Sequence, residues 1–417
     1  MPKKSGLHRP ISLLHIEDQI VLQAFANLAA KRLHKKRAPL QFKIIFSNIL
    51  QKDNSIFFFK HWQETYAAFQ RKIKKDYEAG LRWVADFDLA AFYDTISHEL
   101  LLKTIYPRTW TSDDCKLICR CLRTWSSERS ASSHEHGIPQ GPIASDFLAE
   151  CFLLPVDLAL QRYDGYTRYV DDMRLLGRTR DEVRAAVIQL ERLCWRRGLI
   201  PQSGKFAINR AHSIQDAMGM LPSIADPQHT DGLTSMPRDR ARRLFRSSIE
   251  GKPYKVKDKT RLRYVLFRSE PDPKLLNYVL RLIPNHPEHV DAFFSYIGDF
   301  DFRKPILRLC LDIIKNNPYP YVRGEAWHVL ARYLQVQGAL NEVNIEELKK
   351  RAIEIARSRY DEYFMEKWGA CHFLTVLEKI DGRRFSRFLN YQSPLLQALL
   401  APVLPDAAFT SGEAAGR

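Results

Sequence analysis

The sequence contains no long apolar run. No stretch approaches the roughly 18 to 20 apolar residues of a membrane-spanning helix. No apolar signal core follows the basic start Met1-Pro2-Lys3-Lys4. These absences argue against a membrane protein and against a secreted one, and we expect a cytoplasmic protein without a membrane partner.

Cysteine is also scarce. The seven cysteines are an odd number and lie scattered along the chain, which suits reduced thiols in a cytoplasm. Cys115, Cys119 and Cys121 are close together, but no histidine nearby completes a zinc pattern. Their spacing predicts buried helix residues instead of a metal site.

Acidic residues are in deficit. The 417-residue chain has 64 Lys and Arg against 48 Asp and Glu, so its net charge is +16. Such an excess favours a polyanionic partner, nucleic acid first and an anionic membrane second. Because 45% of the residues are hydrophobic, the chain can bury a sizeable core, and its length suits two or three domains.

Hydrophobic periodicity predicts an α+β order in the first half of the chain. Helices are expected at 11–37, 61–77, 90–105, 145–160 and 181–197, strands at 56–59 and 81–89, and a hairpin at 166–177. A stretch rich in Asp, Gly, Thr, Ser and Pro near 230–237 predicts a boundary.

Beyond that boundary the pattern is almost entirely helical. Helices are expected at 274–283, 288–297, 304–315, 321–334, 345–360 and 362–380, as in an α-solenoid or an irregular bundle. The predicted domains are 1–230, a basic helical segment at 236–270, a repeat-like helical region at 271–405 and a flexible tail at 406–417.

The segment 236–268 carries twelve basic residues against three acidic ones. This density predicts contact with a phosphate backbone, although a solvated helix face is the alternative. The predicted nucleic-acid-binding residues are Arg238, Arg240, Arg242, Arg243 and Arg246.

Aspartates stand where two predicted strands end. Asp171 and Asp172 lie at the tip of the hairpin, and Asp88 lies where a strand gives way to a helix. Acids at a hairpin tip are often only solvated turn residues, because Asp tolerates turn geometry. Nucleotide transfer, however, requires two Mg²⁺ ions held by carboxylates, and aspartates on adjacent strands meet that need.

Five sequence blocks in order resemble reverse transcriptases, specifically the bacterial ones. They are His8-Arg9-Pro10-Ile11-Ser12, Asp88-Leu89-Ala90-Ala91-Phe92-Tyr93-Asp94-Thr95-Ile96-Ser97-His98, Gly137-Ile138-Pro139-Gln140-Gly141, Tyr169-Val170-Asp171-Asp172, and Gly198-Leu199 through Lys205. The resemblance spans roughly residues 8 to 210. It implies fingers and palm of a right-hand polymerase, followed by an all-α region with a thumb.

The resemblance also implies roles for single residues. Asp88 and Asp171 would bind two Mg²⁺ ions, with Mn²⁺ as a substitute, and Asp172 would support them. Tyr93 would stack under the incoming sugar and exclude ribonucleotides; the alternative is an ordinary helix aromatic.

Three further positions complete the implied site. Gln140 and Gly141 would shape the nucleotide pocket, and Lys205 would be the general acid toward pyrophosphate, or else a surface charge. Asp94 and His98 fit a structural role better, such as helix capping.

The chain departs from the family pattern on the next helix. Asp146 stands where proline is usual, and Glu150 stands where asparagine is common. The pair Ser145-Asp146 is predicted to cap that helix.

The basic segment and helical tail resemble the defence-associated and abortive-infection reverse transcriptases, which protect bacteria against phage. The resemblance implies dNTP substrates, a non-coding RNA template and a cDNA product. Alternatives are template-independent or protein-primed DNA synthesis, and an RNA-binding scaffold with little catalysis. A homo-oligomer is also compatible with the sequence.

Overall fold

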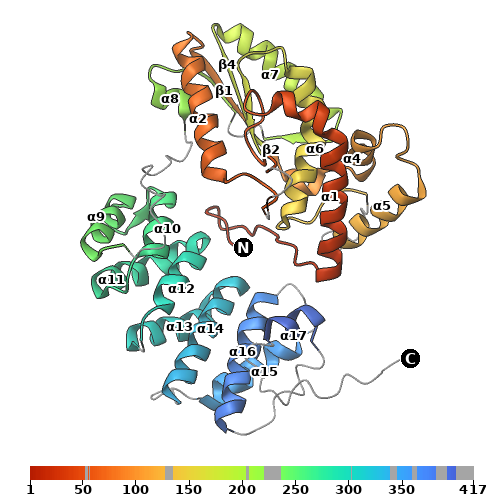
Figure 1. The fold of residues 1–417 in the computed structure, drawn as a ribbon. Coiled ribbons are helices and arrows are strands. Elements are labelled where there is room, and N and C mark those ends of the chain that lie inside the picture. The colour runs from red at the N-terminus through yellow and green to blue at the C-terminus, as the bar shows by residue number, and fades with distance from the viewer. Residues whose placement is uncertain are drawn as a thin grey trace. The chain divides into compact units, whose positions relative to one another are not determined.

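The computed structural model describes residues 1–51, 55, 57–126, 135–202, 206–219, 236–301, 303–338, 345–358, 364–381 and 392–400. These residues fall into two compact units (Figure 1): Pro10–Leu221, and Met1–Arg9 together with Pro222–Arg417. The predicted tail at 406–417 lies outside the described residues.

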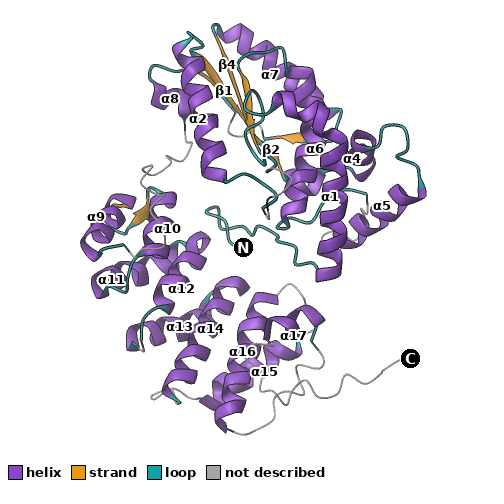
Figure 2. Ribbon diagram, in the orientation of Figure 1, coloured by secondary structure: helices purple, strands orange, loops and turns teal. Residues whose placement is uncertain are grey.

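A four-stranded antiparallel sheet organises the unit Pro10–Leu221. Its order is β3-β4-β1-β6, with β1 Trp83–Phe87, β3 Tyr166–Tyr169, β4 Asp172–Gly177 and β6 Ile208–Arg210. A second, two-stranded sheet pairs β2 Leu89–Ala90 with β5 Ile200–Pro201. The central strands read as mostly apolar runs, because the sheet is covered by helices, shown with it in Figure 2.

The helices of this unit are α1 Ile16–Arg37, α2 Trp62–Glu78, α3 Phe92–Thr95, α4 His98–Ile105, α5 Asp113–Ser126, α6 Ile143–Leu160, α7 Arg180–Trp195 and α8 Ile214–Met218. Helix α7 packs on β1, β4 and β6, while α2 packs beside β3. Helix α6 is apolar on nearly every face and contacts α1, α4 and α7, so it is the central helix of the core.

Three local predictions differ from the structure. The helix expected from residue 11 begins only at Ile16. The helix expected at 90–105 is two helices, because Ile96 is extended and the Ser97 side chain caps α4. The strand expected at 56–59 lies partly outside the described residues, and Phe59 forms only an isolated bridge with Leu50.

The second unit is helical, with a short hairpin of β7 Ile249–Glu250 and β8 Lys255–Val256. Its helices are α9 Arg238–Ser248, α10 Lys259–Arg268, α11 Pro273–Leu282, α12 Val290–Gly298, α13 Lys304–Asn316, α14 Pro320–Gln337, α15 Ile345–Arg357, α16 Phe364–Asp381 and α17 Pro394–Leu400. One hydrophobic core runs from Met236 to Leu400, so the segment at 236–270 shares its core with the helices after it.

The N-terminal residues do not group with the palm, where the sequence placed them. Met1–Arg9 belongs to the helical unit. The Tyr319 hydroxyl donates a hydrogen bond to the Gly6 carbonyl at 2.9 Å, and the His8 ring packs on Tyr319 with centroids 5.1 Å apart. None of the helices in the described part of the chain is long and apolar enough to cross a membrane.

Candidate active site

Strand pairing brings the predicted carboxylates to one end of the sheet. Antiparallel pairing of β1 with β4 places Phe87 opposite Met173, so the next residues outward are Asp88 and Asp172. Asp171 lies in the turn beside them. The carboxyl group of Asp88 is exposed and accepts a hydrogen bond from the Leu89 amide at 2.9 Å.

The turn between β3 and β4 is strained. Because Tyr169 pairs with Asp172, the two turn residues are Val170 and Asp171, one position earlier than the acids alone indicated. Val170 has φ = 58°, a left-handed conformation that is costly for a β-branched residue. Such a turn persists only when its surroundings hold it.

Side chains hold both backbone polar groups of Val170. Its N–H donates to the Ser47 hydroxyl at 2.7 Å, and its carbonyl accepts from the Arg168 guanidinium at 2.8 Å. Ser47 in turn donates to Glu150. The strained residue next to Asp171 is therefore fixed from both sides.

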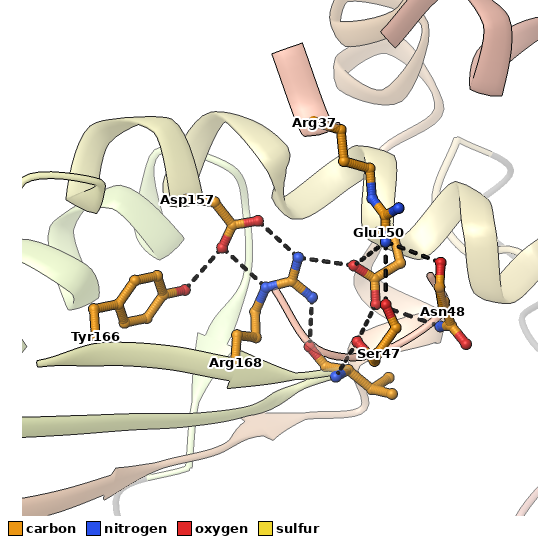
Figure 3. Close-up of polar contacts among 8 residues, drawn as sticks. Arg37, Ser47, Asn48, Glu150, Asp157, Tyr166 and Arg168 are labelled. Atoms are coloured by element: carbon orange, nitrogen blue, oxygen red, sulfur yellow. Dashed lines mark hydrogen bonds and ion pairs between the residues drawn. The ribbon is translucent and has the colours of Figure 1, made fainter. Parts of the chain in front are cut away.

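Ser47 and Arg168 belong to a larger buried cluster (Figure 3). We call it the hairpin network, and its members are Arg37, Ser47, Glu150, Asp157 and Arg168. Arg168 donates to Asp157 at 2.9 and 2.7 Å and to Glu150 at 2.8 Å. Arg37 approaches the same Glu150 at 3.5 Å and donates to the Ser47 carbonyl at 3.1 Å.

Charge is balanced within the hairpin network. Two arginines face two carboxylates, and every member is at most 1% exposed. Burial opposes the charge of the Arg168 guanidinium, but Asp157 and Glu150 raise its pKa above the ordinary value. The network ties α1 and α6 to the hairpin that carries Asp171 and Asp172.

The helix pattern expected at 11–37 did not indicate this network. Arg37, the last residue of α1, is buried against Glu150. A usable signal was present: Glu150 and Asp157 are isolated charges two turns apart in the apolar α6. Buried charges of this kind require partners.

The hydroxyl of Tyr93 is bonded to Asp146, one of the two α6 residues that depart from the family pattern. Its hydroxyl donates to Asp146 Oδ1 at 2.6 Å, and its carbonyl accepts from the Ile138 amide at 3.0 Å. The prediction that Ser145-Asp146 caps the helix is wrong, because α6 begins at Ile143 with Pro142 as its N-cap.

Burial dominates the titration of this pair. It raises the pKa of Asp146 to about 6, against the hydrogen bond from Tyr93, and the charge of Glu150 raises it further. Burial also raises the pKa of Tyr93 well above its usual value, with added contributions from Asp146 and Asp171. Tyr93 therefore lies within electrostatic range of the predicted metal ligand Asp171.

The loop of Gln140 and Gly141 is packed against the first sequence block. The Ser12 amide donates to the Gln140 carbonyl at 2.8 Å. Gly141 has φ = +130°, and a Cβ there would lie 3.1 Å from an Ile11 methyl group, so a side chain would meet both strain and crowding. His98 holds the start of this loop by contacting the Gly137 carbonyl at 2.6 Å.

The donor set at the hairpin suits a hard cation. Asp88, Asp171 and Asp172 offer only carboxylate oxygens, which Mg²⁺ prefers, and Mg²⁺ commonly uses one or two carboxylates plus substrate phosphates. In the described ranges, no group of three or more His, Cys, Asp or Glu side chains is arranged to hold a metal. Substrate oxygens and water would complete the coordination. Lys205, the predicted general acid, lies outside the described residues.

The predicted nucleic-acid-binding arginines lie on α9 in the helical unit, and they are not equivalent. Arg242 is partly buried and donates to Asp272 at 2.6 and 3.0 Å, so its guanidinium is committed to the N-terminus of α11. The other predicted arginines of α9 are exposed: Arg238, Arg240, Arg243 and Arg246. Contact with phosphate therefore stays a prediction for these four.

Comparisons with known proteins agree with this geometry. The family described as reverse transcriptase (RNA-dependent DNA polymerase) matches residues 1–220. The putative COX1/OXI3 intron 2 protein of Saccharomyces cerevisiae is 25% identical over 165 residues, which are 39% of this chain and 17% of that protein. The chain thus spans less than a fifth of this curated relative.

Two solved telomerase structures overlap weakly with the chain. The telomerase of Candida albicans with a fragment of telomeric RNA has a TM-score of 0.32 at 12% identity, covering 84% of this chain and 57% of that one. Apo telomerase of Candida tropicalis has a TM-score of 0.34 at 9% identity, covering 91% and 61%. Structural similarities with TM-scores this low support no conclusion about function.

Proposed function

Because the chain belongs to the reverse transcriptase (RNA-dependent DNA polymerase) family, we propose that it synthesises DNA on an RNA template by nucleotidyl transfer. One observation carries the proposal: β1 and the β3–β4 hairpin bring Asp88 and Asp172 to neighbouring positions, with Asp171 in the adjoining turn. The hairpin network holds that turn in a strained conformation, as expected for a site whose geometry matters.

In this proposal Asp88 and Asp171 would hold two Mg²⁺ ions, with Asp172 in support. The bound metal would supply Lewis-acid activation of the primer 3′-hydroxyl and charge stabilisation of the leaving pyrophosphate. The protein's own contribution is to hold the carboxylates in place and to position the sugar of the incoming dNTP against Tyr93. Gln140 and Gly141 shape the same pocket, and Lys205 is proposed as the proton donor to pyrophosphate.

We further propose that the template is a dedicated non-coding RNA and that the enzyme acts in bacterial anti-phage defence in the cytoplasm. The resemblance of the sequence blocks and the basic segment supports this. Exposed arginines on α9 favour RNA binding, and they equally support the second candidate, a scaffold that binds RNA with little catalysis. Untemplated or protein-primed synthesis is a third mode of the same active site.

The experiment compares the full chain with the variant Asp171→Ala/Asp172→Ala, each purified from cells that carry its native locus. The RNA and DNA that copurify are sequenced, and nucleotide incorporation is measured. The matched control is Asp113→Ala, because that carboxylate is 96% exposed at the start of α5. Circular dichroism checks that each variant is folded.

We expect one discrete RNA with its complementary DNA in the wild type and the control, and no DNA in the double variant. Incorporation that survives in the double variant would refute the assignment of the metal ligands. DNA of low complexity without a matching RNA would favour untemplated synthesis. Tight RNA binding with no DNA in any sample would favour the scaffold.

A further inference from the structure

Tyr93 is fixed at two points. Its backbone carbonyl is bonded to the Ile138 amide at 3.0 Å, and its hydroxyl is bonded to Asp146 at 2.6 Å. The ring between these points packs on Phe92 with centroids 5.6 Å apart. A side chain held at both ends cannot swing as one held only by its backbone can.

Asp146 is itself a rigid anchor. It lies in the first turn of α6, between the buried Ser145 and Phe147, in the central helix of the core. Glu150, one turn further along α6, is locked in the hairpin network. Because the backbone of Asp146 is fixed in the core, a displacement of the Tyr93 hydroxyl strains or breaks this hydrogen bond.

We propose that Asp146 is a positioning residue that sets the discrimination between deoxyribonucleotides and ribonucleotides by fixing the Tyr93 ring. The inference rests on the proposed function, in which Tyr93 lies under the incoming sugar. A ring excludes a 2′-hydroxyl only if it does not yield by the roughly 1 Å that matters for positioning in an active site. The bond to Asp146 is what keeps the ring from yielding.

The expected size follows from the strength of this bond. A hydrogen bond to a charged partner contributes about 1.5–3 kcal/mol, which corresponds to a change of about tenfold to a hundredfold in a rate ratio. Loss of the Asp146 carboxylate should therefore lower discrimination by about that factor. Most of the change should come from faster ribonucleotide incorporation, since the ring no longer blocks the 2′-hydroxyl.

The test measures single-nucleotide incorporation by the full-length protein on a primed RNA template, with dGTP and with GTP. The ratio of the two kcat/KM values is compared in wild type, Asp146→Ala, Asp146→Asn, Tyr93→Phe and the double variant Tyr93→Phe/Asp146→Ala. Tyr93→Ala is the reference for complete loss of the ring. Asp146→Asn is the matched conservative change, because its amide oxygen can still accept the bond and it guards against a misfolded alanine variant.

We expect Asp146→Ala and Tyr93→Phe each to lower the ratio by about tenfold or more. The double variant should be no worse than either single change, because both remove one bond. Asp146→Asn should stay within about threefold of wild type. A merely structural role for Asp146 would lower dGTP and GTP incorporation together and leave the ratio unchanged.

Two results would overturn the inference while the proposed function stands. One is that Asp146→Ala keeps the wild-type ratio of kcat/KM for dGTP to kcat/KM for GTP, while Tyr93→Ala loses this discrimination. The other is additive loss in the double variant, which would mean that Asp146 acts apart from Tyr93. Absence of incorporation by the wild type on every template would instead overturn the proposed function, and this inference with it.

Discussion

Two polar clusters, one in each unit, differ in how their ionisable groups are paired. The hairpin network pairs two carboxylates with two guanidiniums, even though burial raises the pKa of Asp157. A second cluster, which we call the α14–α16 cluster, consists of Glu325, His328 and His372. Its two imidazoles meet through their Nδ1 atoms at 2.8 Å, and within the described part of the protein neither Nε2 has a hydrogen-bond partner.

Burial suppresses charge in the α14–α16 cluster. It lowers the pKa of His328 to about 3 and that of His372 to about 4, and it raises the pKa of Glu325 to about 7. At neutral pH both imidazoles are uncharged, so one Nδ1 donates to the other. The comparison shows that the hairpin unit pairs buried carboxylates with arginines where they fix a strained turn. The α14–α16 cluster instead holds groups whose charged forms burial disfavours.

The largest effect is expected from breaking the hairpin network. Arg168→Met should lower the free energy of unfolding by about 3–5 kcal/mol, because it leaves Asp157 and Glu150 buried without their main cation. Urea denaturation followed by circular dichroism measures the change. The control is Arg184→Met, since the Arg184 side chain is 52% exposed and pairs with an exposed Asp181, so a change within about 0.5 kcal/mol is expected.

A loss below about 1 kcal/mol for Arg168→Met would contradict this view of the network. The double variant Arg168→Met/Asp157→Asn sharpens the test. It removes one of the unpaired charges, so it should be more stable than Arg168→Met alone. Destabilisation that simply adds would show that the two side chains do not act as a pair.

The next effect concerns the α14–α16 cluster and has a defined pH dependence. The pKa of Glu325 is about 7 in the folded protein, above the value of roughly 4.3 in an unfolded chain. Its contribution to stability is therefore complete at low pH and is lost as the pH rises through 7. Glu325→Gln should raise the free energy of unfolding at pH 8 by up to about 3 kcal/mol and change it little at pH 5.

Thermal unfolding of the wild type and Glu325→Gln across pH 5 to 8 measures this. The matched control is Glu347→Gln, an exposed carboxylate on α15. Equal melting temperatures of wild type and Glu325→Gln at pH 8 would show that folding does not raise the pKa of Glu325. The lowered pKa values of the histidines act in the opposite sense, so the wild type should lose stability as the pH falls below about 6.5.

Replacement of Ser47 is expected to lower stability by a smaller amount and also to lower catalytic activity. Ser47→Ala leaves the Val170 amide without its acceptor beside the predicted metal ligand Asp171. The free energy of unfolding should fall by about 1–3 kcal/mol. Incorporation at saturating dNTP should fall about tenfold or more, because the strained turn can relax. The exposed hydroxyl of Thr124 provides the control, and Thr124→Ala should change neither quantity.

Local signals explain what was predictable from the sequence. The strand that ends at Asp88 and the hairpin that carries Asp171 are short apolar runs interrupted by acids, and this pattern depends only on neighbouring residues. Helices α11 to α16 of the second unit were predicted for the same reason, because their apolar positions recur with the helical period.

Long-range pairing explains what was not predictable. Ser47 and Glu150 are 103 residues apart, and Tyr93 and Asp146 are 53 apart, so no local pattern joins them. Asp146 was read as a helix cap from its neighbour Ser145, and the tertiary bond to Tyr93 replaced that role. A charged residue isolated in an apolar helix indicates that a buried partner exists, but it does not identify that partner.

The smallest effect separates arginines along one helix. In the described structure neither Arg243 nor Arg246 of α9 forms an ion pair, whereas Arg242 is bound to Asp272. If exposed arginines contact phosphate, Arg243→Gln/Arg246→Gln should lower the slope of log K against log salt for single-stranded RNA by about 1.4. Filter binding from 50 to 300 mM salt measures the slope.

Arg242→Gln, on the same helix, is the control. It should leave the slope unchanged and lower stability instead. An unchanged slope in the double variant Arg243→Gln/Arg246→Gln would show that α9 is not part of the RNA-binding surface.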